Sequence, residues 1–461
     1  MNLSGILTAG ANGLAAASHG TQVTSQNISN ATTEGYTRRV AQFEPIPLDQ
    51  GGGVRSRGSV RIQDAYLERR GLGARAANGE AAAKQETLSV FDSIFNEEQG
   101  SLGGALDAFD SALSDFAANP SSRANRQAIL SKAEDLSRAF NATSNALTTA
   151  RTDANARIAD SVKQVNTKLD QIGELSTQIV AAYVNGNEAG DLEDRRDQLI
   201  REVGEYIPVQ VIPDKQGAIT LQMAGQRTLV GPDSSVHHLL AIPEATSGDI
   251  RIYRDTAGQN EDITAMISSG KIGGTFAARD GALATAKQQL DQLASDVATA
   301  YNAQHVLGYG ADGVNGRNLF APPASVAGAA ASFAVSGDVA GQPDLIAGAQ
   351  DPLNLPSDNR NAIAMLHVRD QLVALGGTAT AQQAFTALVA DAGTAAQQAN
   401  HQATQANAVL EQIDNLRASA SGVSTDEEMI ALMKFQRAYQ ASLRVIETAD
   451  SMLNDLLSLR R

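Results

Sequence analysis

The six histidines are the residues of this sequence with the widest chemical use, because imidazole serves as a general base and as a metal ligand. A zinc site on a helix places two histidines four residues apart on one face. No two of the six have that spacing, and the adjacent pair 237–238 would point to opposite faces of a strand. We therefore predict no metal site. The histidines are His19, His237, His238, His305, His367 and His401.

A second candidate is GYGADG at residues 308–313, which matches the G-x-G-x-x-G pattern of nucleotide-binding loops. Such a site needs a strand before the pattern and a helix after it, so that the phosphate meets the helix N-terminus. Here the sequence predicts a helix before the pattern and a loop after it. The same segment contains Asp312, Asn315 and Asn318 but lacks the final glutamate of a calcium-binding loop. We predict neither a nucleotide nor a calcium site.

Carboxylates concentrate in GDLEDRRDQL, where Asp191, Glu193, Asp194 and Asp197 surround two arginines. Paired carboxylates can perform acid–base catalysis. At the start of a helix, however, acids interact favourably with the helix dipole and pair with arginines one turn away. We interpret this segment as a structural helix start. Since the chain also lacks a Ser/His/Asp arrangement and a G-x-S-x-G elbow, we predict that it is not an enzyme and uses no cofactor.

The composition sets further limits. Net charge is −15, which argues against nucleic-acid binding because phosphates require clustered Lys and Arg. Cysteine is absent, so disulfides, zinc–thiolate sites and thiol nucleophiles are excluded. No apolar run approaches the roughly 18 residues of a membrane helix, and the N-terminus lacks the basic region of a signal peptide. We predict a globular chain that binds neither nucleic acid nor membrane.

Both ends of the chain carry the heptad pattern of helices that pack side by side. The N-terminal pattern is filled mostly by small residues, and no Lys or Arg precedes Arg38. In the C-terminal pattern large apolar residues predominate, and Thr425 with Glu428 has the spacing of a capping box. Either pattern alone also fits an ordinary core-facing helix. The patterns comprise Leu3, Leu7, Gly10, Leu14, Ala17, Thr21, Thr24 and Ile28, and Leu432, Phe435, Tyr439, Ser442, Ile446, Ala449, Leu453 and Leu456.

Long helices are predicted between the two ends. Heptad runs begin at Ile129 and Ile158, and such helices pack at shallow angles into a rod-like bundle. Residues 206–268 instead alternate as strands do, with the turn signal DKQG between two strands. Helix returns at residues 281–304 and again from about residue 360, separated by loop with short strands at about 308–359.

These elements predict a mainly α fold with a smaller β-rich module. The chain would be an elongated, hairpin-like, multidomain protein in which the terminal helices form a coiled coil and long helices form the body. We assign residues 1–35 and 425–461 to the terminal assembly domain, 36–205 and 269–424 to the helical body, and 206–268 to the outer β-rich module.

Several segments resemble one protein family. ANGLAAASHGTQVTSQNISNATTEGYTRR resembles the N-terminal motif of bacterial flagellar axial proteins, and its ending resembles the hook-associated protein 1 branch, the first hook–filament junction protein. SGVSTDEEMIALMKFQRAYQASLRVIETADSMLNDLLSL is similar to that family's C-terminus. Three interior segments agree: DLEDRRDQLIREVGEYIPVQVI, QLASDVATAYNAQHVLGYGADGVNGRNLF and SDNRNAIAML. The chain departs from the axial motif at Glu34, where proline is common, and it is shorter than well-known members.

The resemblance implies a structural part of the flagellum at the junction between hook and filament, required for filament assembly. The terminal segments would be disordered in the free subunit and would pair as helices in the assembled tube. Export would use the flagellar type III exporter, and the final location would be the extracellular flagellum. The implied partners are a ring of identical subunits, the hook protein, the second hook–filament junction protein and an export chaperone. The residues assigned to assembly and export are Leu3, Leu7, Gly10, Leu14, Ile28, Asn30, Gly35, Tyr36, Leu432, Phe435, Tyr439, Ile446, Ala449, Leu453 and Leu456.

Two alternatives remain at this point. A rod- or hook-type axial protein would share the N-terminal motif, but those proteins are dominated by β domains. A secreted effector that uses the flagellar exporter would carry catalytic groups and would not need two matched terminal patterns.

Overall fold

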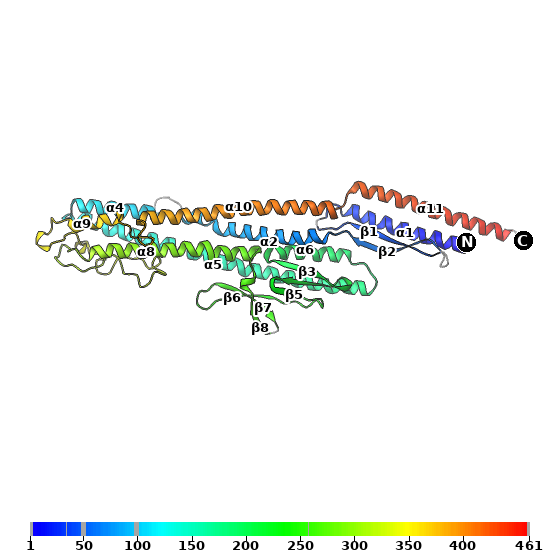
Figure 1. Ribbon diagram of the computed structural model, residues 1–461, viewed down its shortest axis with the longest axis horizontal. Coiled ribbons are helices and arrows are strands. Elements are labelled where there is room, and N and C mark those ends of the chain that lie inside the picture. Colours follow the sequence, from blue (N-terminus) through cyan, green and yellow to red (C-terminus); the bar gives the residue numbers. More distant parts are fainter. Residues whose placement is uncertain (1–2, 34, 48–51, 96–100, 257, 459–461) are drawn as a thin grey trace.

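The computed structural model describes residues 3–33, 35–47, 52–95, 101–256 and 258–458. The molecule is a long rod of helices with a small β-rich part on one side (Figure 1). The first and last helices lie together at one end of the rod (Figure 1). The prediction of an elongated, mainly α, hairpin-like fold is therefore confirmed. Residues 1–2, 34 and 459–461, which belong to the predicted terminal segments, lie outside the described residues.

The longest element is α5 (Arg123–Val184), a continuous helix of 62 residues. At the α-helical rise it is about 93 Å long. Ser122 accepts a hydrogen bond from the backbone N–H of Asn125 and so caps its first turn. Both predicted heptad runs lie on its buried face, where it packs against α4 (Leu102–Ala118) and α6 (Gly190–Tyr206). One helix thus runs through most of the body and gives the molecule its rod shape.

Close helix packing in the body depends on small residues. A Cβ added to Gly79 would lie 2.1 Å from the carbonyl oxygen of Glu205, and one added to Gly274 would lie 2.0 Å from that of Glu80. These backbones approach so closely that only glycine fits. The remaining body helices are α2 (Ala65–Leu88), α3 (Phe91–Ile94), α7 (Gly270–Ala277), α8 (Ala284–His305), α9 (Arg360–Leu366) and α10 (Ala381–Ser421).

The β-rich part consists of two three-stranded antiparallel sheets, in the orders β3-β4-β5 and β6-β7-β8. All six strands fall within the predicted range 206–268. The DKQG segment forms the turn between β3 and β4, and Ile219, Leu221 and Met223 share a buried face as predicted. These side chains belong to one apolar cluster with the second half of α5. The strands are β3 (Val209–Pro213), β4 (Ile219–Met223), β5 (Arg227–Val230), β6 (Leu239–Pro243), β7 (Ile250–Thr256) and β8 (Gln259–Asp262).

The region between α8 and α9 is mostly loop, as predicted, and the GYGADG segment follows a helix and continues as loop. The predicted short strands are absent from this described region. Only isolated bridges occur there, Tyr309 with Ala349 and Phe320 with Val335. Side-chain contacts, instead of the hydrogen-bond ladders of a β-sheet, hold the chain in place here.

His305 provides one of those contacts. It is fully buried, its Nδ1 lies 2.8 Å from the carbonyl oxygen of Arg317, and its Nε2 accepts a hydrogen bond from the backbone N–H of Ala347 at 3.0 Å. Burial lowers the pKa of His305 to about 4. A neutral histidine therefore fixes two separate parts of the loop region to the end of α8.

The terminal helices α1 (Leu3–Ser29) and α11 (Thr425–Ser458) lie side by side. After α1, the chain forms an antiparallel hairpin of β1 (Arg39–Pro45) and β2 (Val54–Arg61) that lies along α1 (Figure 1). The sequence analysis assigned this stretch to the body domain and did not predict its two strands. The two strands contain many polar residues and lack a regular alternation of apolar positions, so hydrophobic periodicity could not reveal them.

Candidate assembly site

The terminal helices contact each other where three glycines of α1 face larger side chains of α11. Successive contacts from Gly10 to Gly20 of α1 involve residues of decreasing number in α11, from Ile446 to Phe435, so the two helices are antiparallel. None of the three positions has room for a side chain without a shift of its neighbour. A Cβ added to Gly10 would lie 2.8 Å from Cγ1 of Ile446, one on Gly13 would lie 2.7 Å from Oγ of Ser442, and one on Gly20 would lie 2.4 Å from the ring of Phe435.

On α11, the predicted pattern lies on the side that faces α1 or at its edge. Ala449 is buried, whereas Tyr439 and Leu456 remain 38% and 58% exposed. The half-buried members are Leu432, Phe435, Ser442, Ile446 and Leu453.

On α1, only part of the predicted pattern faces α11. Gly10, Ala17 and Thr24 are buried, but Leu3, Leu7, Leu14, Thr21 and Ile28 are only half-buried. The intervening layers are formed by Gly13, Gly20 and Asn27. The prediction is thus wrong by one residue at every second position of the pattern, where Gly13, Gly20 and Asn27 take the places of Leu14, Thr21 and Ile28. Apolar periodicity did not detect these three because they carry no apolar side chain.

Asn27 is the polar layer of this seam and is 1% exposed. Its side-chain amide donates to a carboxylate oxygen of Glu428 at 3.0 Å and to the carbonyl oxygen of Arg39 at 2.8 Å. Its Oδ1 accepts hydrogen bonds from the hydroxyl of Tyr36 at 2.9 Å and from the backbone N–H of Arg39 at 3.1 Å. One asparagine therefore joins α1, α11 and the start of the hairpin.

Glu428 is 3% exposed and also accepts a hydrogen bond from Nε of Arg38 at 2.8 Å. The backbone N–H of Arg38 donates to the carbonyl oxygen of Ser421, at the end of α10. Glu428 therefore does not act as the capping-box partner of Thr425 that the sequence spacing predicted. Helix α11 already begins at Thr425, and the Glu428 carboxylate contacts Asn27 and Arg38.

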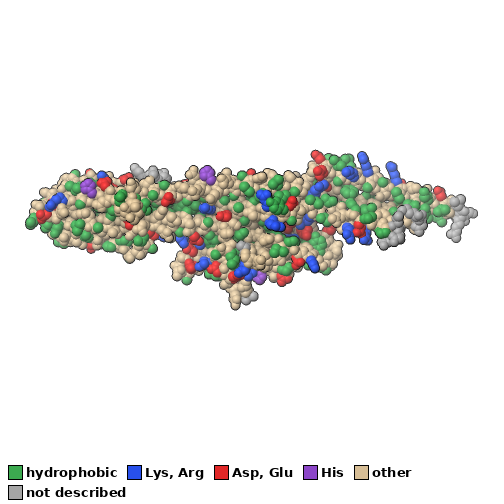
Figure 2. Space-filling view, in the orientation of Figure 1, with side chains coloured by type: hydrophobic (Ala, Val, Ile, Leu, Met, Phe, Trp, Pro, Cys, Tyr) green, Lys and Arg blue, Asp and Glu red, His purple; other side chains and the backbone are tan. Residues whose placement is uncertain are grey.

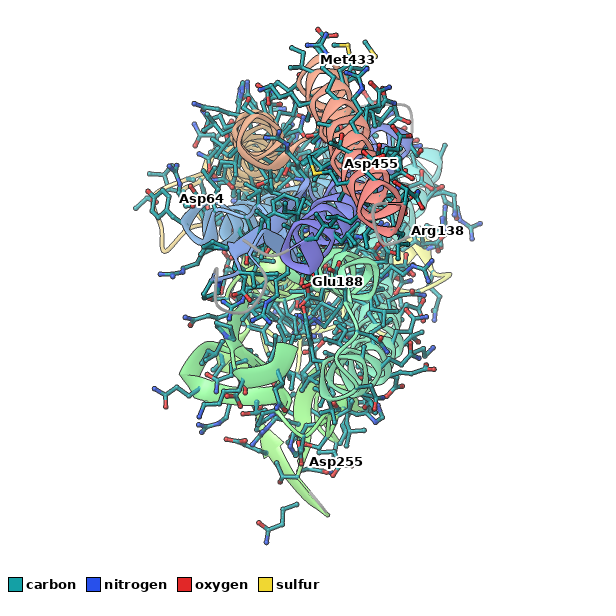
Figure 3. All side chains as sticks on the ribbon, turned by 90° about the vertical axis from the view of Figure 1, so that its right-hand side faces the viewer. Asp64, Arg138, Glu188, Asp255, Met433 and Asp455 are labelled. Atoms are coloured by element: carbon teal, nitrogen blue, oxygen red, sulfur yellow. The ribbon has the colours of Figure 1, made fainter. Side chains whose placement is uncertain are left out.

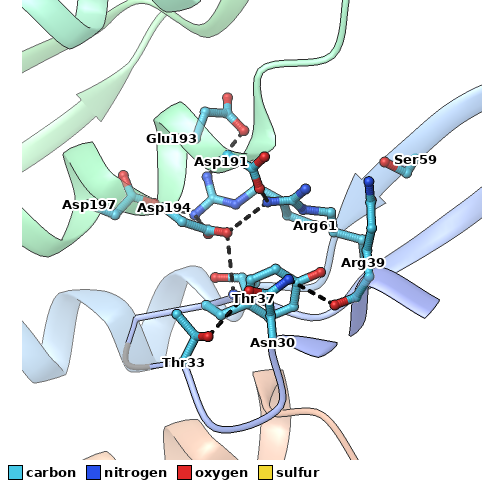
Figure 4. A network of polar contacts seen from close by, with 12 residues as sticks. Asn30, Thr33, Thr37, Arg39, Ser59, Arg61, Asp191, Glu193, Asp194 and Asp197 are labelled. Carbon is cyan, nitrogen blue, oxygen red and sulfur yellow. Dashed lines mark hydrogen bonds and ion pairs between the residues drawn. The ribbon is translucent and has the colours of Figure 1, made fainter. Parts of the chain in front are cut away.

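Arg39 and Arg61 are cross-strand partners at the open end of the hairpin, and both bind the acidic first turns of α6 (Figure 4). Burial alone would lower the pKa of both guanidinium groups, but the surrounding carboxylates raise the pKa of each above its usual value. The ion pairs join Arg39 to Asp191 at 2.6 Å and to Asp194 at 3.0 Å, and Arg61 to Glu193 at 3.2 Å, to Asp194 at 2.8 Å and to Asp197 at 2.5 Å.

The GDLEDRRDQL segment does open a helix, with Asp191 and Glu193 in the first turn of α6. The expectation that its acids pair with arginines of the same segment is wrong. Arg196 donates to the carbonyl oxygen of Gly217 at 2.6 Å, and its closest approach to Asp197 is 3.9 Å. The main partners come from the hairpin, which the sequence analysis did not predict.

The remaining predicted residues form the turn between α1 and the hairpin. Asn30 donates to the carbonyl oxygen of Gln26 and accepts from the hydroxyl of Thr33 (Figure 4). Gly35 has φ of +81°, a conformation that favours glycine, and so allows the chain to leave the helix. Burial raises the pKa of Tyr36, whose hydroxyl donates to Asn27. Glu34, the departure from the axial motif, lies outside the described residues.

The outer side of α11 carries exposed apolar and basic side chains. Figure 3, seen from the terminal end of the rod, shows Met433 on the side of α11 away from α1, and Figure 2 shows Lys and Arg side chains projecting from this part of the molecule. Within the described residues, Lys434, Arg437 and Arg444 form no ion pair. The exposed large apolar residues of this helix are Met429, Ile430, Met433, Tyr439, Leu443, Val445, Met452, Leu456 and Leu457.

The described part of the chain holds neither a metal-type cluster nor a membrane-spanning helix. Three or more His, Asp or Glu side chains do not converge anywhere there as a metal ion would require. Nor does any helix in the described ranges have the length and apolar content for a membrane span.

Comparison with known proteins identifies the family. The family model "Flagellar hook-associated protein FlgK helical domain" matches residues 88–320. A second model, "Flagellar basal body rod FlgEFG protein C-terminal", matches residues 417–459, which include α11.

Curated relatives agree over the whole chain. Flagellar hook-associated protein 1 of Salmonella typhimurium is 27% identical, with 99% of this chain and 100% of the relative covered. The proteins of that name from Escherichia coli and Bacillus subtilis are 28% and 26% identical, the first over 99% of this chain and 100% of the relative, the second over 94% of each. The solved flagellar hook junction protein FlgK from Burkholderia pseudomallei shares the fold, with a TM-score of 0.69 at 16% identity, over 77% of this chain and 100% of that chain. Because the helical-domain model alone spans half of the sequence, this chain belongs to the flagellar hook-associated protein FlgK family.

Proposed function

We propose that this chain is a structural component of the bacterial flagellum that forms the junction between hook and filament and is required for filament assembly. The observation that carries the proposal is the antiparallel pairing of α1 with α11. This pairing brings both ends of a 461-residue chain to one end of a rod and leaves the body free to project. Family membership supplies the biological setting.

In the assembly, a ring of identical subunits would cover the outer side of α11. So many exposed apolar side chains on one helix are unusual on a free soluble surface and are typical of a protein interface. The hook protein would lie on one side of the ring and the second hook–filament junction protein on the other. The predicted assembly residues, such as Leu3, Leu7 and Leu14 of α1 and Tyr439 and Leu456 of α11, would contribute the apolar area that one chain leaves incompletely buried.

The decisive experiment is electron microscopy of a strain that lacks this gene. The proposal predicts hooks without filaments, restored by the full chain but not by a chain ending before Thr425. Intact flagella in the deletion strain would rule out the junction role and favour a secreted effector. Loss of hooks together with filaments would favour a rod- or hook-type role.

Export is the second part of the proposal. The flagellar type III exporter would carry the chain to the extracellular flagellum, and a dedicated chaperone would cover α11 in the cytoplasm. The exposed apolar side chains of α11 support this, because they would promote aggregation if left uncovered. Removal of residues 425–461 should abolish recovery of the chaperone with the tagged chain. Undiminished recovery would place the chaperone site elsewhere.

A further inference from the structure

The seam between α1 and α11 contains two equivalent places for one aromatic ring. Phe435 lies directly on Gly20, at 2.4 Å from the position that a Cβ would take. Gly13 lies seven residues earlier on the same face and also presents bare backbone to α11. A shift of α11 by one heptad would therefore place Phe435 on Gly13, which also has no side chain to oppose the ring. The two glycines alone do not distinguish these registers, although the same shift would move Ile446 from Gly10 to about Leu3.

The shifted register has a definite structural cost. It moves α11 away from α10 by about 10 Å, which is seven residues of helical rise. The connection at residues 422–424 spans at most about 11 Å when extended and already joins the two helices. The first two turns of α11, residues 425–431, would therefore have to unwind.

Those two turns are attached mainly through one buried side chain, and the exposed Glu427 adds an ion pair with Arg38 at 3.4 Å. Glu428 is buried, whereas Thr425, Glu427, Met429 and Ile430 are exposed. The carboxylate of Glu428 is held by Asn27 at 3.0 Å and by Arg38 at 2.8 Å. In the shifted register these turns would leave the helix, and the contacts of Glu428 with Asn27 and Arg38 would be lost.

We infer that the Asn27–Glu428 pair specifies the register of the terminal helix pair. A single buried polar layer in a coiled coil fixes register, because each misaligned arrangement leaves a buried polar group without its partner. A shift by one heptad in the other direction would place the Phe435 ring against the Asn27 side chain, so steric overlap opposes it. The inference concerns pairing within one chain and does not depend on the proposed function.

One other contact competes for this role. The rings of Phe43, on the hairpin, and Phe435 lie 5.9 Å apart between centroids. A heptad shift would separate them as well. The experiment must therefore distinguish the polar pair from this aromatic contact.

The natural absence of cysteine allows register to be measured with two engineered disulfides. A Cβ on Gly13 lies 3.6 Å from Cβ of Ser442, within the range of a disulfide, so Gly13→Cys with Ser442→Cys reports the observed register. Ile6→Cys with Ser442→Cys reports the shifted one, because Ile6 precedes Gly13 by one heptad. In the observed register that second pair is about 10 Å apart along the helices, too far to bridge.

Each reporter is built into the full chain, and its disulfide is equilibrated in a glutathione buffer. The fraction oxidised measures the paired population even where the helices are only marginally stable. In the otherwise native chain, the first disulfide should form at least about tenfold more favourably than the second, a preference of about 1.4 kcal/mol.

In the double variant Asn27→Leu with Glu428→Leu, the disulfide that reports the shifted register should form more readily. The preference for the observed-register disulfide over the shifted one should then fall to within about threefold, less than about 0.7 kcal/mol. Glu427→Gln, which alters the neighbouring exposed carboxylate, is the matched control and should leave the preference intact. Phe43→Ala should also leave it intact. The inference is overturned if the double leucine variant keeps the native preference, if Phe43→Ala abolishes it, or if the native chain shows none.

Discussion

Arg38 and Arg39 are neighbours in the chain but bind different helices. The guanidinium of Arg38 contacts Glu428 of α11 at 2.8 Å, and that of Arg39 contacts Asp194 of α6 at 3.0 Å. Successive side chains at the start of a strand point in opposite directions, which explains the division. Two adjacent arginines thus connect the terminal helix pair to the body.

Removal of Arg39 should destabilise the chain strongly. Arg39 and Asp194 are each 7% exposed, so Arg39→Met leaves a buried carboxylate short of one partner. We expect the free energy of unfolding to fall by about 3 kcal/mol, as for other broken buried ion pairs. Urea titration followed by circular dichroism measures it. Arg55→Met, which breaks an exposed pair with Glu44, is the control and should cost less than about 1 kcal/mol. Equal effects from the two variants would contradict a buried connection.

A methyl group on Gly20 should weaken the terminal pair. Gly20→Ala places a Cβ against the Phe435 ring, and overpacking of this kind costs about 1–3 kcal/mol. Gly393→Ala, in the middle of α10 with no atom within 4 Å, should instead stabilise by up to about 1 kcal/mol. Loss of amide protection in α11, measured by mass spectrometry, would report the first effect. Unchanged protection with Gly20→Ala would mean that the two helices do not pack closely.

The terminal helices should exchange their amide hydrogens before the body does. Only Glu428 and Ala449 of α11 are buried, whereas buried residues recur along the whole of α5. Local opening should therefore require less free energy in α1 and α11, with exchange more than about tenfold faster than in α5. Protection of both terminal helices equal to that of α5 in the free chain would refute disorder before assembly.

The loop region should lose stability in acid because of His305. Its pKa is about 4 in the folded chain and near 6.5 when unfolded, so the unfolded state binds the proton first. The contribution of neutral His305 is complete above about pH 6.5 and declines as the pH falls to about 4, by about 3 kcal/mol in total. Unfolding free energies across this range should fall less steeply for His305→Gln. The exposed His401→Gln should retain the steep fall, and identical slopes for all three chains would exclude His305 as the cause.

Sequence periodicity identified the elements that pack through apolar side chains. The two runs from Ile129 and Ile158 lie on the buried face of α5, and Phe435, Ile446 and Ala449 lie where the C-terminal pattern placed them. Alternation likewise located the β-rich part, since Ile219, Leu221 and Met223 share a buried face. In each case the local repeat reflects a single apolar surface, which can be detected in a short stretch of sequence.

Only the tertiary structure determined which face of α1 meets α11 and what the early arginines bind. Gly13 and Gly20 contribute by having no side chain, so no hydrophobic signal marks them. The hairpin is held to α6 by Arg39 and Arg61, whose carboxylate partners lie about 130 to 155 residues further along the chain. Charge attraction depends on distance in space and leaves no periodicity in either segment. The pairing of Asn27 with Glu428, 401 residues away, belongs to the same class, because it exists only once the two ends of the chain have been brought together.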